Sequence, residues 1–96
     1  EAIANLRSAL SRETTSAMGY RQLAAGFARK AETVQGQARQ QLMAQAELAS
    51  AEAYFYEGQL RLAKEQAKRA KVGLVNGSPN WIKADDILTF QVPRTN

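Results

Sequence analysis

The chain has 96 residues, enough for one small domain with a modest core. It contains 18 Ala and 9 Gln but no His or Cys, which excludes disulfides, thiolate or imidazole zinc sites and His-dependent nucleophilic catalysis within these residues. The net charge is +4 and the pI is about 9.8, so an acidic partner is permitted. No apolar run approaches the roughly 18 residues of a membrane span.

Two helices are predicted in the first third of the chain. Residues 1–11 carry apolar side chains at helical spacing, and because the sequence opens directly in this pattern we expect it to be a piece of a longer protein. The second helix is expected over residues 17–32. Its apolar stripe is Tyr20, Leu23, Ala24, Phe27 and Ala31.

Residues 37–57 form the longest predicted helix, because they contain no Gly or Pro. Its apolar side chains fall into two stripes. One stripe is Leu42, Ala46, Ala49, Ala53 and Tyr56, and the other is Leu48, Ala51 and Phe55. Two stripes predict neighbours on two sides, so this should be the central helix.

Two further helices complete the pattern. Residues 59–72 form a predicted helix with small residues on its inward face. A closing helix that contains the single Trp is expected to begin at Ser78-Pro79, because Ser caps a helix and Pro suits its first position. Residues 91–96 are predicted to be a flexible tail. The sequence therefore predicts an all-α single domain over residues 1–90, with about five helices.

Residues 44–70 resemble a tetratricopeptide (TPR) unit, with small residues, an aromatic and a turn Gly at its spacing. The matching positions are Ala51, Tyr54, Gly58, Ala63 and Ala70. Small residues would let the two helices approach closely, while the aromatic fills the space between them. Phe27 and Tyr54 are too close for the 34-residue period of this repeat. The long helix is therefore expected to close one unit with its first half and open the next with its second.

Three strings in the sequence are similar to the C-terminal end of bacterial zinc-dependent metalloproteases of the BepA-like, HtpX-related family. They are residues 20–24, residues 46–53 with Gly58, and the closing segment Gly77-Ser78-Pro79-Asn80-Trp81 with Ala84, Asp86 and Ile87. The resemblance implies a TPR-like tail that binds clients or partners for an upstream protease domain, in the periplasm, during envelope protein quality control. The family's HExxH helix and its zinc would belong to that upstream domain, since no His occurs here.

The residues predicted to line a protein-binding groove come from two helices, because the first helices of successive TPR units line a concave surface. They are Met18, Arg21, Ala25 and Arg29 on one helix, and Gln45, Leu48, Glu52 and Phe55 on the next. Such a groove could hold an extended or helical peptide. The alternative is that the array is too short to curve and these side chains pack against an upstream part of the protein.

A basic stripe on the fourth predicted helix suggests an alternative function. It consists of Arg61, Lys64, Lys68 and Lys71, with Arg69 beside it. A free-standing helical adaptor could bind nucleic acid through this row, but no aromatic alternates with it to stack bases, so a solvated face is favoured. Adjacent Asp85 and Asp86 point about 100° apart and are expected to be solvated charges. An Ala-rich bundle can also pair with itself.

Overall fold

The computed structural model describes residues 17–92, and every regular element in that range is an α-helix. In chain order they are α2 (Ala17–Ala31), α3 (Gly36–Tyr56), α4 (Leu60–Gly73) and α5 (Pro79–Thr89). Four of the predicted helices thus exist, and the all-α class is confirmed. The helix predicted over residues 1–11 and most of the predicted tail lie outside the described residues.

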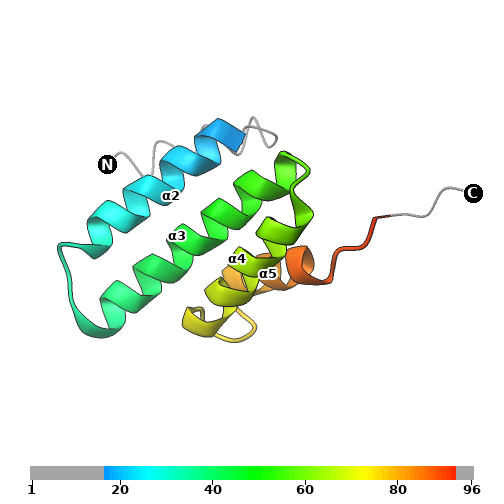
Figure 1. The fold of residues 1–96 in the computed structure, drawn as a ribbon. Coiled ribbons are helices and arrows are strands. Elements are labelled where there is room, and N and C mark those ends of the chain that lie inside the picture. Colours follow the sequence, from blue (N-terminus) through cyan, green and yellow to red (C-terminus); the bar gives the residue numbers. More distant parts are fainter. Residues whose placement is uncertain (1–16, 93–96) are drawn as a thin grey trace, which may run out of the picture.

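The long helix α3 is the centre of the arrangement (Figure 1). Helices α2 and α4 each run alongside it in the opposite direction, and α5 packs against both α4 and α3. Within residues 17–92, α2 has no contact with α4 or α5. Because α2 and α4 flank α3 without meeting, no helix among residues 17–92 covers the surface of α3 between them.

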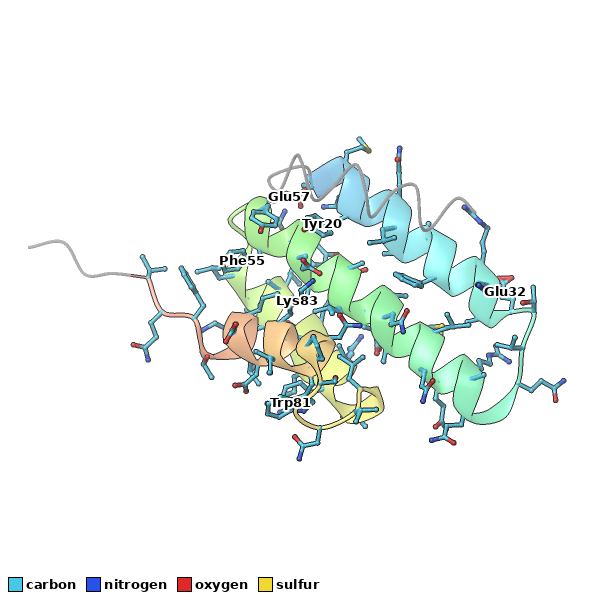
Figure 2. All side chains as sticks on the ribbon, turned by 180° about the vertical axis from the view of Figure 1, so that it is seen from behind. Tyr20, Glu32, Phe55, Glu57, Trp81 and Lys83 are labelled. Carbon is cyan, nitrogen blue, oxygen red and sulfur yellow. The ribbon has the colours of Figure 1, made fainter. Side chains whose placement is uncertain are left out.

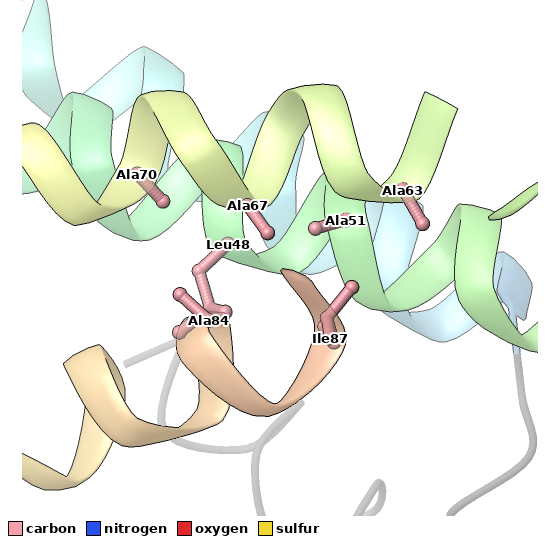
Figure 3. Close-up of a cluster of buried hydrophobic side chains, with 7 residues drawn as sticks. All are labelled: Leu48, Ala51, Ala63, Ala67, Ala70, Ala84 and Ile87. Carbon is pink, nitrogen blue, oxygen red and sulfur yellow. The ribbon is translucent and has the colours of Figure 1, made fainter. Parts of the chain in front are cut away.

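Two separate apolar cores form along α3, one against each neighbour. The α2 core contains Leu23, Ala24, Phe27, Ala46 and Ala49, with Tyr20 and Leu42 at its edge. The α4–α5 core contains Leu48, Ala51, Ala63, Ala67, Ala70, Ala84 and Ile87 (Figure 3). The two predicted apolar stripes of α3 therefore do face different neighbours.

Helices α2 and α4 contact different sides of α3, and neither is confined to one half of it. This corrects the expectation that the first half of the long helix closes one unit and its second half opens the next. Ala44, in its first half, lies against Gly73 of α4. Tyr56, in its last turn, stacks on Tyr20 of α2 at a ring distance of 5.6 Å. Each neighbour contacts both halves of the helix, because the apolar stripes that face the two neighbours lie on separate sides of it.

Helix α4 approaches α3 closely because its inward residues are small. All three of its buried side chains are alanines, Ala63, Ala67 and Ala70, with no exposed surface. At its end, a Cβ added to Gly73 would lie 2.8 Å from the Cβ of Ala44, closer than real Cβ contacts come. The helices pack at a separation that larger residues would not allow.

Local signals in the sequence explain where these helices begin and end. Gly58 has a φ of 80°, a left-handed conformation that glycine adopts without strain, and it turns the chain from α3 into α4. The Ser78 side chain accepts a hydrogen bond from the backbone N–H of Trp81 at 3.2 Å, and Pro79 takes the first helical position. The cap predicted for the closing helix is confirmed.

A charged contact fixes α5 to α4. The Lys71 Nζ donates a hydrogen bond to Asp85 Oδ1 at 2.7 Å and lies 4.4 Å from the centre of the Trp81 ring. Both charged side chains are partly buried, so solvent screens this pair less than a surface pair. The ion pair and the cation–π contact together hold the start of the closing helix in place.

Candidate interaction surface

The uncovered side of α3 is hollowed along its borders with α2 and α4. A concavity of about 420 Å³ lies between α2 and α3, and another of about 580 Å³ lies between α3 and α4. Met43 and Glu47 line both, so the two concavities adjoin across α3. We call this combined surface the central hollow.

The α2 part of the central hollow is lined mainly by small side chains. Besides the two shared residues, it is lined by Arg21, Ala24, Ala25, Ala28, Ala46 and Ser50. Alanines on two adjoining helices leave a shallow trough between their backbones. This part of the surface could accept the apolar side chains of another polypeptide.

The α4 part of the central hollow combines apolar and basic side chains. Its other lining residues are Arg39, Gln40, Ala44, Arg69, Val72 and Gly73. Val72 is 89% exposed and Met43 is 42% exposed, although both are apolar. Exposed apolar side chains that share one concave surface are typical of binding surfaces, whereas isolated ones are not.

Basic side chains outnumber acidic ones in the central hollow. The lining residues include three arginines and one carboxylate, that of Glu47. Burial raises the pKa of the Glu47 carboxyl, and the positive charge of Arg69 opposes that rise. The hollow therefore carries a net positive charge above a partly apolar floor.

Arg21 is held in place at the edge of the α2 part. Its guanidinium forms an ion pair with the Glu57 carboxylate and lies 5.3 Å from the centre of the Tyr54 ring. These contacts tie α2 to the end of α3, where Tyr20 also stacks on Tyr56; Figure 2 labels Tyr20 and Glu57. Arg21 is thus engaged within the fold, unlike an arginine that only faces solvent.

Of the predicted groove residues on α2, two line the central hollow. Arg21 and Ala25 do so, and both have exposed side chains. Met18 and Arg29 are also exposed but are not among the lining residues. The α2 half of the predicted groove therefore partly coincides with the hollow.

The predicted groove residues on α3 lie elsewhere. Leu48 is only 4% exposed, in the α4–α5 core, and Phe55 packs edge-to-face on Phe90 with ring centres 4.9 Å apart. Glu52 accepts a hydrogen bond from the Tyr20 phenol. Burial of this phenol, together with the negative charge of Glu52, raises the pKa of Tyr20. Gln45 is partly buried.

The two halves of the predicted groove do not form one surface. At about 100° per residue, the predicted row on α3 is centred roughly 150° around the helix from the row of Met43, Glu47 and Ser50 that lines the hollow. Leu48 and Phe55 belong to the second apolar stripe, whose burial against α4 and α5 removes them from an open groove. In the sequence, the row of Met43, Glu47 and Ser50, which belongs to neither apolar stripe of α3, could have located the hollow.

The basic stripe of α4 is divided by the fold. Lys71 is bound to Asp85, Arg61 pairs with Glu65 at 3.2 Å, and Arg69 lines the central hollow. The stripe is therefore not a uniform row of solvent-facing cations. Of the two predicted solvated carboxylates, Asp86 is exposed, but Asp85 is part of the contact that holds α5, which sequence reasoning missed.

Comparison with known proteins does not place this chain in a family. No protein-family model matches the chain, and no curated protein or solved structure is significantly similar to it. Between residues 17 and 92, no group of three or more His, Cys, Asp or Glu side chains could hold a metal ion. None of the helices in that range is long and apolar enough to cross a membrane.

Proposed function

We propose that this chain is a non-catalytic protein-interaction domain that holds a peptide segment of a partner protein in the central hollow. The observation that carries the proposal is the exposure of Met43 and Val72 in the concavity between α3 and α4, which adjoins the one between α2 and α3. A groove with an apolar floor and polar edges suits peptide recognition, because the floor buries apolar side chains while the edges fix their register.

A TPR-like architecture is part of the proposal. The buried cluster unites Ala51, Ala63 and Ala70, and Tyr54 packs against it, as expected for a TPR helix pair. Helix α5 packs on both helices of that pair, as the next unit of a stacked array would. These contacts support a helical-repeat arrangement in which α3 and α4 form one unit.

We extend the proposal to the parent protein on the resemblance of the closing segment alone. The domain would serve a periplasmic zinc-dependent metalloprotease in envelope protein quality control, presenting unfolded clients to an upstream catalytic domain. Zinc would be held there, because this chain has neither His nor Cys. The role of the described residues would be recognition, with no chemical step of their own.

Peptide selection tests the interaction function. Random peptides of about 12 residues, a length that a groove of this kind can engage, are displayed and selected on the immobilised chain. Affinities of the selected peptides are then measured by fluorescence anisotropy. Met43→Asp is expected to weaken binding roughly tenfold by placing a charge on the apolar floor. Met18→Asp, an equal change outside the hollow, should leave affinity unchanged.

Two results would overturn this function. One is that no peptide binds better than a scrambled helical control. The other is that the two Met variants lose affinity equally, which would locate binding outside the central hollow. Binding of unfolded outer-membrane proteins to the same chain tests the extension to envelope quality control, and its absence would remove that extension alone.

The alternative of a nucleic-acid-binding adaptor has weaker structural support. Two cations of the α4 stripe, Arg61 and Lys71, already pair with carboxylates of the fold. Nucleic-acid binding would weaken steeply with added salt, because each phosphate contact releases counterions. A salt titration with a single-stranded oligonucleotide separates this function from peptide binding.

A further inference from the structure

We infer that the occupant of the central hollow is an acidic peptide whose carboxylates bind Arg39 and Arg69 while an apolar side chain rests on Met43 and Val72. The inference depends on the proposed function and specifies the partner's chemistry. Its basis is charge complementarity, because three arginines and one glutamate line the hollow.

Arg39 and Arg69 are the arginines available to a partner. Arg21 is already paired with Glu57 and lies against Tyr54. Arg39 and Arg69, by contrast, form no ion pair with any other residue in the described range 17–92, although the charge of Arg69 acts on the nearby Glu47 carboxyl and opposes the rise of its pKa. A guanidinium offers paired N–H donors that match the two oxygens of a carboxylate, so each could bind one acidic side chain.

The apolar part of the surface lies among these charges. Met43, Val72 and both arginines line the same concavity between α3 and α4. Gly73 and Ala44, which lie against each other, also line it and add no long side chain to it. An occupant that places an apolar side chain between two carboxylates would therefore match this concavity in both shape and charge.

Glu47 sets where the occupant's charges can lie. Glu47 lines both concavities together with Met43, where the two parts of the hollow adjoin. Acidic groups of an occupant would be repelled there and attracted toward Arg39 and Arg69. Removing the charge of Glu47 should therefore strengthen binding, an effect that damage to the fold would not produce.

A peptide fits this surface better than a nucleic acid. None of the lining residues is aromatic, so the hollow offers no ring on which a base could stack. The exposed side chains of Met43 and Val72 would instead face a phosphate backbone with no apolar group to cover them. We therefore expect the positive charge of the hollow to bind the carboxylates of a peptide and not the phosphates of a nucleic acid.

The test uses the peptide selection described above and the identities of its products. Selected sequences are expected to be enriched in Asp and Glu on either side of an apolar residue. The strongest binder is then synthesised in two forms, as selected and with Gln and Asn in place of Glu and Asp. Anisotropy titrations should show the acidic form binding roughly tenfold more tightly at about 50 mM salt and only a few-fold more tightly at about 300 mM.

Matched variants locate the effect. Arg39→Gln with Arg69→Gln lowers the net charge from +4 to +2 and should weaken binding of the acidic peptide roughly tenfold. Lys68→Gln with Lys83→Gln makes the same change in net charge at exposed positions that do not line the hollow, and should change affinity less than twofold. Glu47→Gln should tighten binding roughly two- to fivefold.

The outcomes separate the two proposals. If selected peptides bind the hollow but are neutral or basic, or if both double variants weaken binding equally, the acidic-partner inference is wrong while the interaction function stands. If no peptide is selected, both fall. If a single-stranded oligonucleotide competes for the hollow in a manner abolished by Arg39→Gln with Arg69→Gln, the ligand is a phosphate chain and the inference is also overturned.

Discussion

The two cores on either side of α3 are built in different ways. The α2 core depends on large side chains, Leu23 and Phe27, packed over alanines of α3. The α4–α5 core depends on close approach, because five of its seven residues are alanines. The first should be most sensitive to losing a large side chain, and the second to gaining one.

The difference explains why a surface is left for binding. Alanine packing keeps α4 near α3, while α2 is held only by α3 among the described helices. A third row of α3, containing Met43 and Glu47, is then covered by neither core and lines the central hollow. Substitutions in each core should consequently act on different helices.

The largest effect is expected from Phe27→Ala, which removes the large ring from the α2 core. Phe27 is 4% exposed, so its truncation should cost about 3–4 kcal/mol of unfolding free energy. Because α2 contacts no other described helix than α3, hydrogen exchange should show α2 losing protection before α4 does. Met18→Ala, on an exposed side chain, should cost less than about 0.5 kcal/mol. Uniform loss of protection would contradict two separable cores.

Ala67→Leu should break the other core by overfilling it. Ala67 has no exposed surface, and the added methylenes would force α4 away from its neighbours at a cost of about 2–3 kcal/mol. The matched control is Ala38→Leu, since Ala38 is exposed on α3. Chemical denaturation measures both. Equal stability of the two variants would show that the α4–α5 core is not closely packed.

Lys71→Met should loosen the attachment of α5 with a smaller effect. It removes both the ion pair to Asp85 and the cation–π contact to Trp81, at a cost of about 1 kcal/mol. Trp81 is the only Trp, so its fluorescence reports on this end of the fold directly. Lys68→Met is the exposed control. A double-mutant cycle with Asp85→Asn that shows no coupling would contradict the assigned contact.

The smallest effect is expected from Glu47→Gln, and it depends on pH. When folding raises the pKa of a carboxyl, its protonated form stabilises the folded state. This contribution is complete below the unfolded pKa of about 4.5 and is lost as pH rises through the folded pKa. Gln should therefore raise the unfolding free energy at pH 7, by less than about 0.5 kcal/mol because solvent screens the site. Near pH 3 the two proteins should be equally stable. Destabilisation by Gln at pH 7 would contradict the burial of this carboxylate.

The sequence predicted the helices and the buried faces well, because both depend on local patterns. Gly58 and the Ser78-Pro79 cap set boundaries, and the two apolar stripes of α3 identified its two neighbours. The exposed groove was predicted less well. Its position depends on which sides of α2 and α4 face α3, and periodicity within one helix does not define this relation between helices.

Leu48 shows why the buried faces were easier to predict than the groove. Its spacing placed it both in an apolar stripe and in the predicted groove, two roles that compete for one side chain. Burial against Ala84 and Ile87 satisfies the stripe and leaves no groove at this position. Met43, outside both stripes, carried no such signal of burial and is the residue that the hollow exposes.

The most direct test of a peptide-binding hollow on α3 uses the two methionines of the chain. Met43 lines the central hollow, whereas Met18, on α2, does not line it and is 68% exposed. With both methyl groups carbon-13 labelled, NMR spectra are recorded while a selected peptide is added to saturation. A shift of the Met43 methyl resonance with Met18 unchanged is the predicted result. A shift of Met18 alone, or no change at Met43 in the saturated complex, would contradict binding in the central hollow.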